Sequence, residues 1–196
     1  MDKKIQELLD KQACIELIYR YARACDRRDE ALLRSVYHVD GIDNHGVFIG
    51  PASEFVPWDM HVLATMERTN HFIGNILIEL DGDIAHAETY FIAYHDIRAE
   101  KMKEMLKTGV VMDQEGRKAE VYQMIAAGRY LDRMERRNGV WRFAYKHAVY
   151  DWNATFPSTD TWDRSEKNKD WTFGQRGTAD QSYAYIKCAE ELTGRG

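Results

Sequence analysis

The sequence lacks the motifs of nucleotide-dependent and metal-dependent enzymes. It contains no GxGxxG, Walker, GxSxG or HExxH pattern, and its three cysteines, Cys14, Cys25 and Cys188, show no metal-ligand spacing. An odd number of cysteines without a disulfide framework is typical of a reducing cytoplasm, where we expect the protein. We therefore predict chemistry that uses neither a nucleotide nor a standard metal site.

Strong positive charge and long apolar runs are absent too. The chain of 196 residues has a net charge of -5, which argues against a general affinity for nucleic acid. Its apolar runs are too short to span a bilayer, and the charged, amphipathic start MDKKIQELLD has no signal-peptide core. The 44% of hydrophobic and 30% of charged residues are those of a soluble globular domain with a sizeable core.

The pattern of elements changes from helical to extended along the chain. Apolar residues recur at helical spacing over residues 3–25, a short second helix follows in DEALLRSVY, and Pro51 suits the first turn of a helix that runs to about Met66. The turn signals DGD and RNG then predict two hairpins, joined by a charged connection over residues 98–118. Helices followed by an antiparallel sheet predict an α+β fold with the helices on one face of a curved sheet.

Residues 153–196 form a tail that differs from the domain predicted over residues 1–152. The tail is polar, yet it carries Trp162, Trp171 and other aromatics that are costly to expose to water. We expect the tail to pack at the mouth of a pocket or at a seam with a neighbouring subunit. The alternative is a disordered tail.

Asp26 stands near the end of the first predicted helix, in YRYARACDRR. The buried stripe of that helix is centred on Ile18, Ala22 and Cys25. At about 100° per residue, Tyr21 lies roughly 60° to one side of this stripe and Asp26 roughly 80° to the other. Asp26 is therefore either a polar stop or cap, or a carboxylate that reaches a cavity at the end of the helix.

Two histidines lie in predicted strands. His71 opens NHFIGNILIEL, where both faces are apolar, so a structural role and a general-base role are both open. His147 shares a predicted face of the last strand with Phe143 and Tyr145, and we expect this face to line the interior. Lys146 is expected on the solvated face.

The segment HVDGIDNHG gathers His38, Asp40, Asp43 and His45. Their spacing matches no defined metal site, and Asp and Gly suit a turn equally well, so no metal ligand is predicted. Asp43 and His45 share a strand face, and we expect them to point into the same cavity as His147.

Three segments resemble the SnoaL-like branch of the nuclear transport factor 2-like superfamily. GRYLDRMERRNGVWRFAYKHAVYDW resembles the family's final hairpin, HVDGIDNHGVFIG the segment after its second helix, and FGQRGTADQSY its tail, apart from Gln181 where a proline is usual. The resemblance covers nearly the whole chain. It implies a cone, also described as a cystatin-like roll, in which a curved antiparallel sheet wraps around N-terminal helices and leaves a pocket at the open end.

The resemblance also implies enzymes without cofactors, such as scytalone dehydratase, bile-acid 7α-dehydratase and hexachlorocyclohexane dehydrochlorinase. In the last two, an Asp after the first helix pairs with a His on the first long strand, and Asp26 and His71 fall at those positions. Tyr21 matches a tyrosine of the bile-acid enzyme. The dehydrochlorinase has an arginine where this chain has Tyr145, which argues against chloride as the leaving group.

We therefore expect a cofactor-free lyase or isomerase that uses general acid–base chemistry on a hydrophobic cyclic or aromatic alcohol, by β-elimination or retro-aldol cleavage. The expected catalytic residues are Asp26, His71 and Tyr21, and the expected substrate contacts are Tyr145, His147, Phe143, Asp43 and His45. The family implies a homodimer or homotrimer. The alternative is a non-catalytic ligand-binding or scaffolding protein of the same fold.

Overall fold

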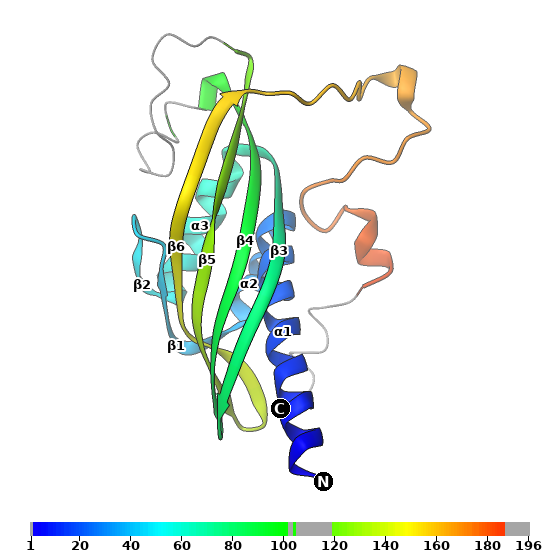
Figure 1. The fold of residues 1–196 in the computed structure, drawn as a ribbon. Coiled ribbons are helices and arrows are strands. Elements are labelled where there is room, and N and C mark those ends of the chain that lie inside the picture. The colour runs from blue at the N-terminus through cyan, green and yellow to red at the C-terminus, as the bar shows by residue number, and fades with distance from the viewer. Residues whose placement is uncertain (1, 102–103, 105–118, 187–196) are drawn as a thin grey trace.

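The computed structural model describes residues 2–101, 104 and 119–186. The helices α1 (Lys3–Arg27), α2 (Glu30–Ser35) and α3 (Ala52–Ala64) lie against one face of a curved six-stranded sheet (Figure 1). Its strands are β1 (Tyr37–Asn44), β2 (Ile49–Pro51), β3 (Met66–Asp81), β4 (Ile84–Arg98), β5 (Val121–Arg137) and β6 (Val140–Pro157), in the order β2-β1-β6-β5-β4-β3. The predicted α+β class and the two long hairpins, β3–β4 and β5–β6, are confirmed.

Residues other than Asp26 end α1 and cap α2. Arg28 adopts the left-handed conformation, with φ 51°, and its backbone N–H bonds back to the last turn of α1. Asp29 caps α2 by accepting a hydrogen bond of 2.9 Å from the Leu32 N–H. Asp26 is therefore neither the stop nor the cap, and its side chain is buried in the fold.

Bulges decide which side chains of the sheet face the helices. In β3, one extra residue lies between Ile73 and Ile76 relative to β4. His71 and Ile73 therefore share the inner face with Ile76, whereas Phe72 is 67% exposed. A strict alternation of faces would instead group Phe72 with Ile76, but the bulge shifts the alternation by one residue.

A second bulge lies in β6, where Phe143 and Tyr145 pair with consecutive residues of β5. Phe143 is buried in the core, and beyond the bulge Lys146 faces inward with no exposed surface. Tyr145 and His147 lie on the other face, where Tyr145 accepts a hydrogen bond of 3.3 Å from Asn44. The expectation that Tyr145 and His147 line the interior while Lys146 is solvated is wrong, because the period of two breaks at the bulge.

The core between α1 and the sheet is aromatic. The Tyr21 ring packs edge-on against Tyr130, Phe143 and Tyr37, with ring centroids 5.6, 6.1 and 6.5 Å away. Trp141 is also in the core, and its indole N–H donates to Asp10 at 3.1 Å. Phe143 is thus a core residue and lines no part of the cavity described below.

The tail returns to α1 after leaving the sheet (Figure 1). Strand β6 continues to Pro157, beyond the predicted boundary at residue 152, and two short 3-10 helices follow at Glu166–Asn168 and Gln181–Ala184. Arg23 of α1 donates to the Ser182 hydroxyl at 3.1 Å, and Tyr183 donates to Asp29 at 2.7 Å. This end of the tail therefore packs on its own subunit. Trp162 and Trp171 contact each other, with ring centroids 4.8 Å apart, but they are 56% and 57% exposed, so the expected burial of these tryptophans is not found within the subunit. A seam with a second subunit stays a prediction.

Cys188 and most of the connection predicted over residues 98–118 lie outside the described residues. Cys14 and Cys25 are buried, unbridged thiols. Within the described ranges, no helix combines the length and the apolar character needed to cross a membrane.

Candidate active site

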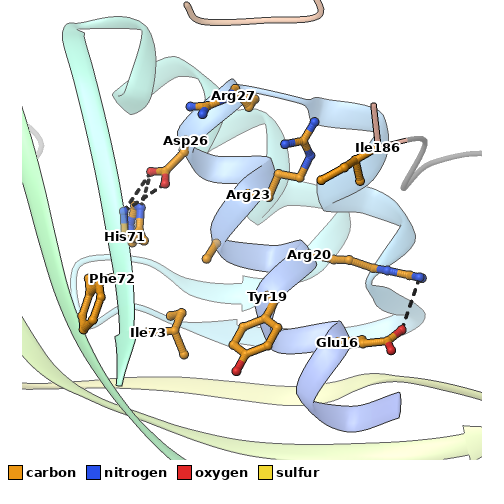
Figure 2. A pocket seen from close by; sticks show the side chains of 11 residues that line it. Glu16, Tyr19, Arg20, Arg23, Asp26, Arg27, His71, Phe72, Ile73 and Ile186 are labelled. Carbon is orange, nitrogen blue, oxygen red and sulfur yellow. Dashed lines mark hydrogen bonds and ion pairs between the residues drawn. The ribbon is translucent and has the colours of Figure 1, made fainter. Parts of the chain in front are cut away.

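Asp26 and His71 form a hydrogen-bonded pair between α1 and β3. Oδ1 of Asp26 lies 2.7 Å from Nδ1 of His71, and the two carboxylate oxygens accept the His71 backbone N–H at 3.1 and 3.0 Å. Figure 2 shows Asp26 directed from the last turn of α1 at His71 on β3. Because an ionised carboxylate only accepts hydrogen bonds, the contact places a proton on Nδ1, and in the neutral imidazole Nε2 then has the lone pair.

The pair is electrostatically suited to hold a positive imidazole. Burial by itself raises the pKa of Asp26, but the hydrogen bonds and charge of His71 outweigh burial, so the pKa of Asp26 is lowered. The carboxylate is therefore ionised throughout the neutral range. It can orient the His71 ring and stabilise an imidazolium when Nε2 takes a proton.

His71 lines an inner cavity of about 350 Å³ between the helices and the sheet. Apolar and aromatic side chains make up most of its wall, among them Trp58, Val62, Met66, Phe91, Tyr130 and Tyr150. His71 also lines an outer groove of about 700 Å³ between α1 and β3, together with Asp26 and the arginines Arg20, Arg23 and Arg27 (Figure 2). The volume and apolar wall of the inner cavity suit a ring-sized ligand, whereas the outer groove is lined by charged side chains.

Tyr21, His45 and Asp43 form a second hydrogen-bonded chain at this cavity. Nδ1 of His45 is bonded to the Asp43 carboxylate, and Nε2 lies 3.2 Å from the Tyr21 hydroxyl. Tyr37 donates to the other oxygen of Asp43 at 2.6 Å. Tyr21 and His45 line the cavity, and Asp43 lies fully buried behind His45. His147, which was expected to point into the same cavity, does not line it, because the bulge in β6 places His147 on the other face of the sheet.

His95 is a cavity residue that was not predicted from the sequence. Its ring lies 5.6 Å from that of His71 and perpendicular to it, and burial lowers the pKa of His95 to about 3, so the ring is neutral. Nδ1 of His95 is buried without a hydrogen-bond partner among the described residues. The signal was present in β4, because His95 follows Phe91 and Ala93 at a spacing of two.

Asp59 is the second cavity residue that was missed. It follows Phe55 by four residues on α3, so the two share the face that packs on the core. Burial raises the pKa of Asp59 from 3.8 to about 6, although His45 partly opposes this, and the Cys25 thiol lies 3.7 Å from its carboxylate. A carboxyl group with such a pKa carries a proton at mildly acidic pH and loses it near neutrality.

We expect Asp59→Asn to stabilise the protein at pH 7.5 but not at pH 3.5. The pKa of Asp59 is raised from 3.8 to about 6 in the folded state, so the folded protein holds this proton more tightly than the unfolded chain does. The resulting stabilisation of the fold is complete below pH 3.8 and is lost as the pH rises through 6. The Asn variant avoids that loss, which amounts to about 1–3 kcal/mol. Urea unfolding at several pH values measures the difference, and a gap between variant and wild type that does not change with pH would contradict the prediction.

A buried ion pair lies behind the cavity wall. Nζ of Lys146 lies 3.1 and 3.2 Å from the two oxygens of Asp132, and both side chains have no exposed surface. The ammonium also lies 3.7 Å from the ring centroid of Tyr130 and 4.2 Å from that of Tyr21. The cation thus sits against two aromatic rings that line the cavity.

The residues of HVDGIDNHG do not converge on one point. His38 bonds to the Glu135 carbonyl at 2.9 Å and Asp40 to Arg137 at 2.6 Å, whereas Asp43 and His45 bond to each other. Over the part of the chain that the structure describes, no group of three or more His, Cys, Asp or Glu side chains is placed to hold a metal ion.

Residues 6–147 match the SnoaL-like domain. The chain belongs to the SnoaL-like family. The predicted resemblance is thereby confirmed, and so is the cone of the nuclear transport factor 2-like superfamily. No curated protein sequence is significantly similar to the chain.

Solved structures share the SnoaL-like cone. A hexachlorocyclohexane dehydrochlorinase, LinA-type3 from Novosphingobium barchaimii, is 15% identical with a TM-score of 0.65, over 83% of this chain and 100% of that chain. A scytalone dehydratase-like protein from Novosphingobium aromaticivorans is 15% identical with a TM-score of 0.60, over 79% and 93%. A protein of unknown function from Mycobacterium tuberculosis is 16% identical with a TM-score of 0.58, over 98% and 91%. At these identities the likeness establishes the fold alone.

Proposed function

We propose that this SnoaL-like protein is a lyase that acts by general acid–base chemistry, without a cofactor, on a hydrophobic cyclic or aromatic alcohol. The observation that carries the proposal is the Asp26–His71 pair at the wall of an apolar cavity. The names of two structural relatives, a dehydrochlorinase and a scytalone dehydratase-like protein, denote eliminations and support the same reaction class. Action in the cytoplasm as a homodimer or homotrimer stays a prediction.

In the proposed reaction, Nε2 of His71 accepts a proton from the substrate. For dehydration, this proton comes from the carbon next to a carbonyl group, and for retro-aldol cleavage it comes from the hydroxyl group. Asp26 stabilises the imidazolium, and the Tyr21 hydroxyl donates to the oxygen on which negative charge develops. Proton transfer of this kind contributes about 10²–10⁴-fold to the rate, and positioning in the cavity contributes further.

The probe 4-hydroxy-4-phenylbutan-2-one tests the proposal and separates the two reactions. Dehydration converts it into benzylideneacetone, and retro-aldol cleavage converts it into benzaldehyde and acetone, so product analysis identifies the reaction. We expect turnover by the wild-type protein and a loss of at least about 10²-fold in His71→Asn. Related cyclic β-hydroxy ketones extend the panel.

Two results would reject the lyase. One is turnover that is unchanged in His71→Asn. The other is tight binding of the probes by the wild-type protein with no product from any of them, which is the behaviour expected of a non-catalytic binding protein of the same fold.

A further inference from the structure

The cavity holds a second carboxylate–imidazole pair that the role of His71 leaves unused. His45 follows β1 and His71 lies in β3, and these strands lie toward opposite ends of the sheet order, so the curved sheet brings them to one cavity. The side chain of His45 is 13% exposed and that of Asp43 is fully buried. The His45 ring stacks on Phe55, with centroids 4.9 Å apart and planes at 23°, which holds its orientation.

The hydrogen bonds around His45 leave only one proton whose position can change, the proton shared between Nε2 of His45 and the Tyr21 hydroxyl. The Asp43 carboxylate only accepts, so Nδ1 of His45 donates to it, and the Tyr37 hydroxyl occupies the other carboxylate oxygen. When the ring is neutral, Nε2 must accept the Tyr21 O–H. When the ring is an imidazolium, Nε2–H donates to the Tyr21 oxygen, and the Tyr21 proton is available to a group in the cavity. The charge on His45 therefore decides whether Tyr21 can act as a proton donor.

We propose that His45, held by Asp43, resupplies the proton that Tyr21 gives to the leaving oxygen of the substrate. This inference rests on the proposed function. In dehydration, His71 takes the proton next to the carbonyl, the C–O bond breaks with its electron pair on oxygen, Tyr21 protonates that oxygen, and the His45 imidazolium reprotonates Tyr21. Water leaves, and exchange with solvent returns the proton from His71 to His45. Tyr21 and His71 are then the catalytic residues, and Asp43 is a positioning residue.

The surroundings of His45 favour the charged ring. Burial by itself lowers the pKa of His45, but the Asp43 carboxylate outweighs burial, so the pKa is raised above 6.5. The other titratable groups around the ring on the packed elements are Tyr21 of α1, Asp59 of α3, Tyr130 and Asp132 of β5, and Lys146 of β6. Asp59, when ionised, favours the imidazolium, and Lys146 opposes it.

A comparison of two leaving groups tests the relay. The first probe is 4-hydroxy-4-phenylbutan-2-one, and the second is its 4-nitrophenyl ether, from which 4-nitrophenolate departs without needing a proton. We expect His45→Gln to lower kcat with the alcohol by about 10²-fold or more and with the ether by less than about 3-fold, because general acid assistance matters only for the poor leaving group. His71→Asn should lower both rates alike, and the matched exchange His86→Gln, at an exposed position, should lower neither.

Equal losses with both probes in His45→Gln would overturn the relay, since a purely structural role for His45 does not depend on the leaving group. Unchanged rates in His71→Asn would instead reject the proposed function. Nitrogen-15 NMR of the histidine rings in the full chain decides the relay without turnover. The relay is supported if both His45 nitrogens carry a proton at pH 7 in the wild type and if the Asp43→Asn variant has lost one of these two protons. A neutral His45 ring in the wild type overturns the relay.

Discussion

Replacing Asp26 with Asn is expected to lower kcat/KM with 4-hydroxy-4-phenylbutan-2-one by about 10³–10⁴-fold while the fold survives. The Asn side chain keeps the shape of Asp26 and an oxygen for the His71 backbone N–H. Its NH₂ group, however, donates where the carboxylate accepted. Nδ1 of His71 must then become the acceptor, which moves the ring proton to Nε2 and removes the lone pair that acts as the base.

Asp29→Asn is the matched control, because it makes the same exchange three residues further along. Asp29 caps α2 and accepts from Tyr183, and Asn is an equally good capping residue. Its activity should stay within about 3-fold of wild type, since Asp29 lines neither the cavity nor the groove. If Asp26→Asn were as active as Asp29→Asn, Asp26 would have only a structural role.

The sequence identified the Asp26–His71 pair through two different kinds of information. Helical periodicity placed Asp26 at the edge of the buried stripe, but it could not separate an inward carboxylate from a cap. The family resemblance favoured the pair, and the structure shows why capping was not needed: Arg28 and Asp29 end one helix and begin the next. A capping role can be assigned only when the start of the following helix is known.

The errors in the last strand have one physical cause. An alternation of two assigns faces correctly only until an extra residue intervenes, and the bulge in β6 lies between Phe143 and Tyr145. Phe143 was therefore placed correctly on the inner face, whereas Tyr145, Lys146 and His147 were each placed on the wrong one. Nothing local marks the bulge, because it depends on the register with β5 and on the curvature of the whole sheet.

The two missed residues, His95 and Asp59, were missed for a different reason. Both lie at positions whose spacing already places them among core residues, His95 with Phe91 on β4 and Asp59 with Phe55 on α3. A polar residue on an apolar face has either a buried partner or a function. That rule, applied along every predicted apolar face, would have identified both.

Lys146→Met is expected to destabilise the protein by about 3–5 kcal/mol, the largest stability effect we predict. The Lys146 ammonium is the buried partner of the Asp132 carboxylate, and both are fully enclosed. Burial already raises the pKa of Asp132 against the opposing effect of Lys146, so removal of the cation leaves a carboxyl group with no charge partner in the core. Lys11→Met, at an exposed position of α1, is the matched control and should change stability by no more than about 0.5 kcal/mol.

The double variant Lys146→Met/Asp132→Leu separates an unpaired charge from lost packing. If the cost of Lys146→Met comes from the carboxyl group left behind, removal of that group should recover most of it, because hydrophobic replacements of a buried pair are often neutral or stabilising. If the cost comes from the contacts of the Lys146 ammonium with the rings of Tyr130 and Tyr21, the double variant should stay as unstable as the single one. Urea unfolding of the four proteins measures both. A loss in Lys146→Met no larger than in Lys11→Met would show that the pair contributes nothing to the stability of the cone.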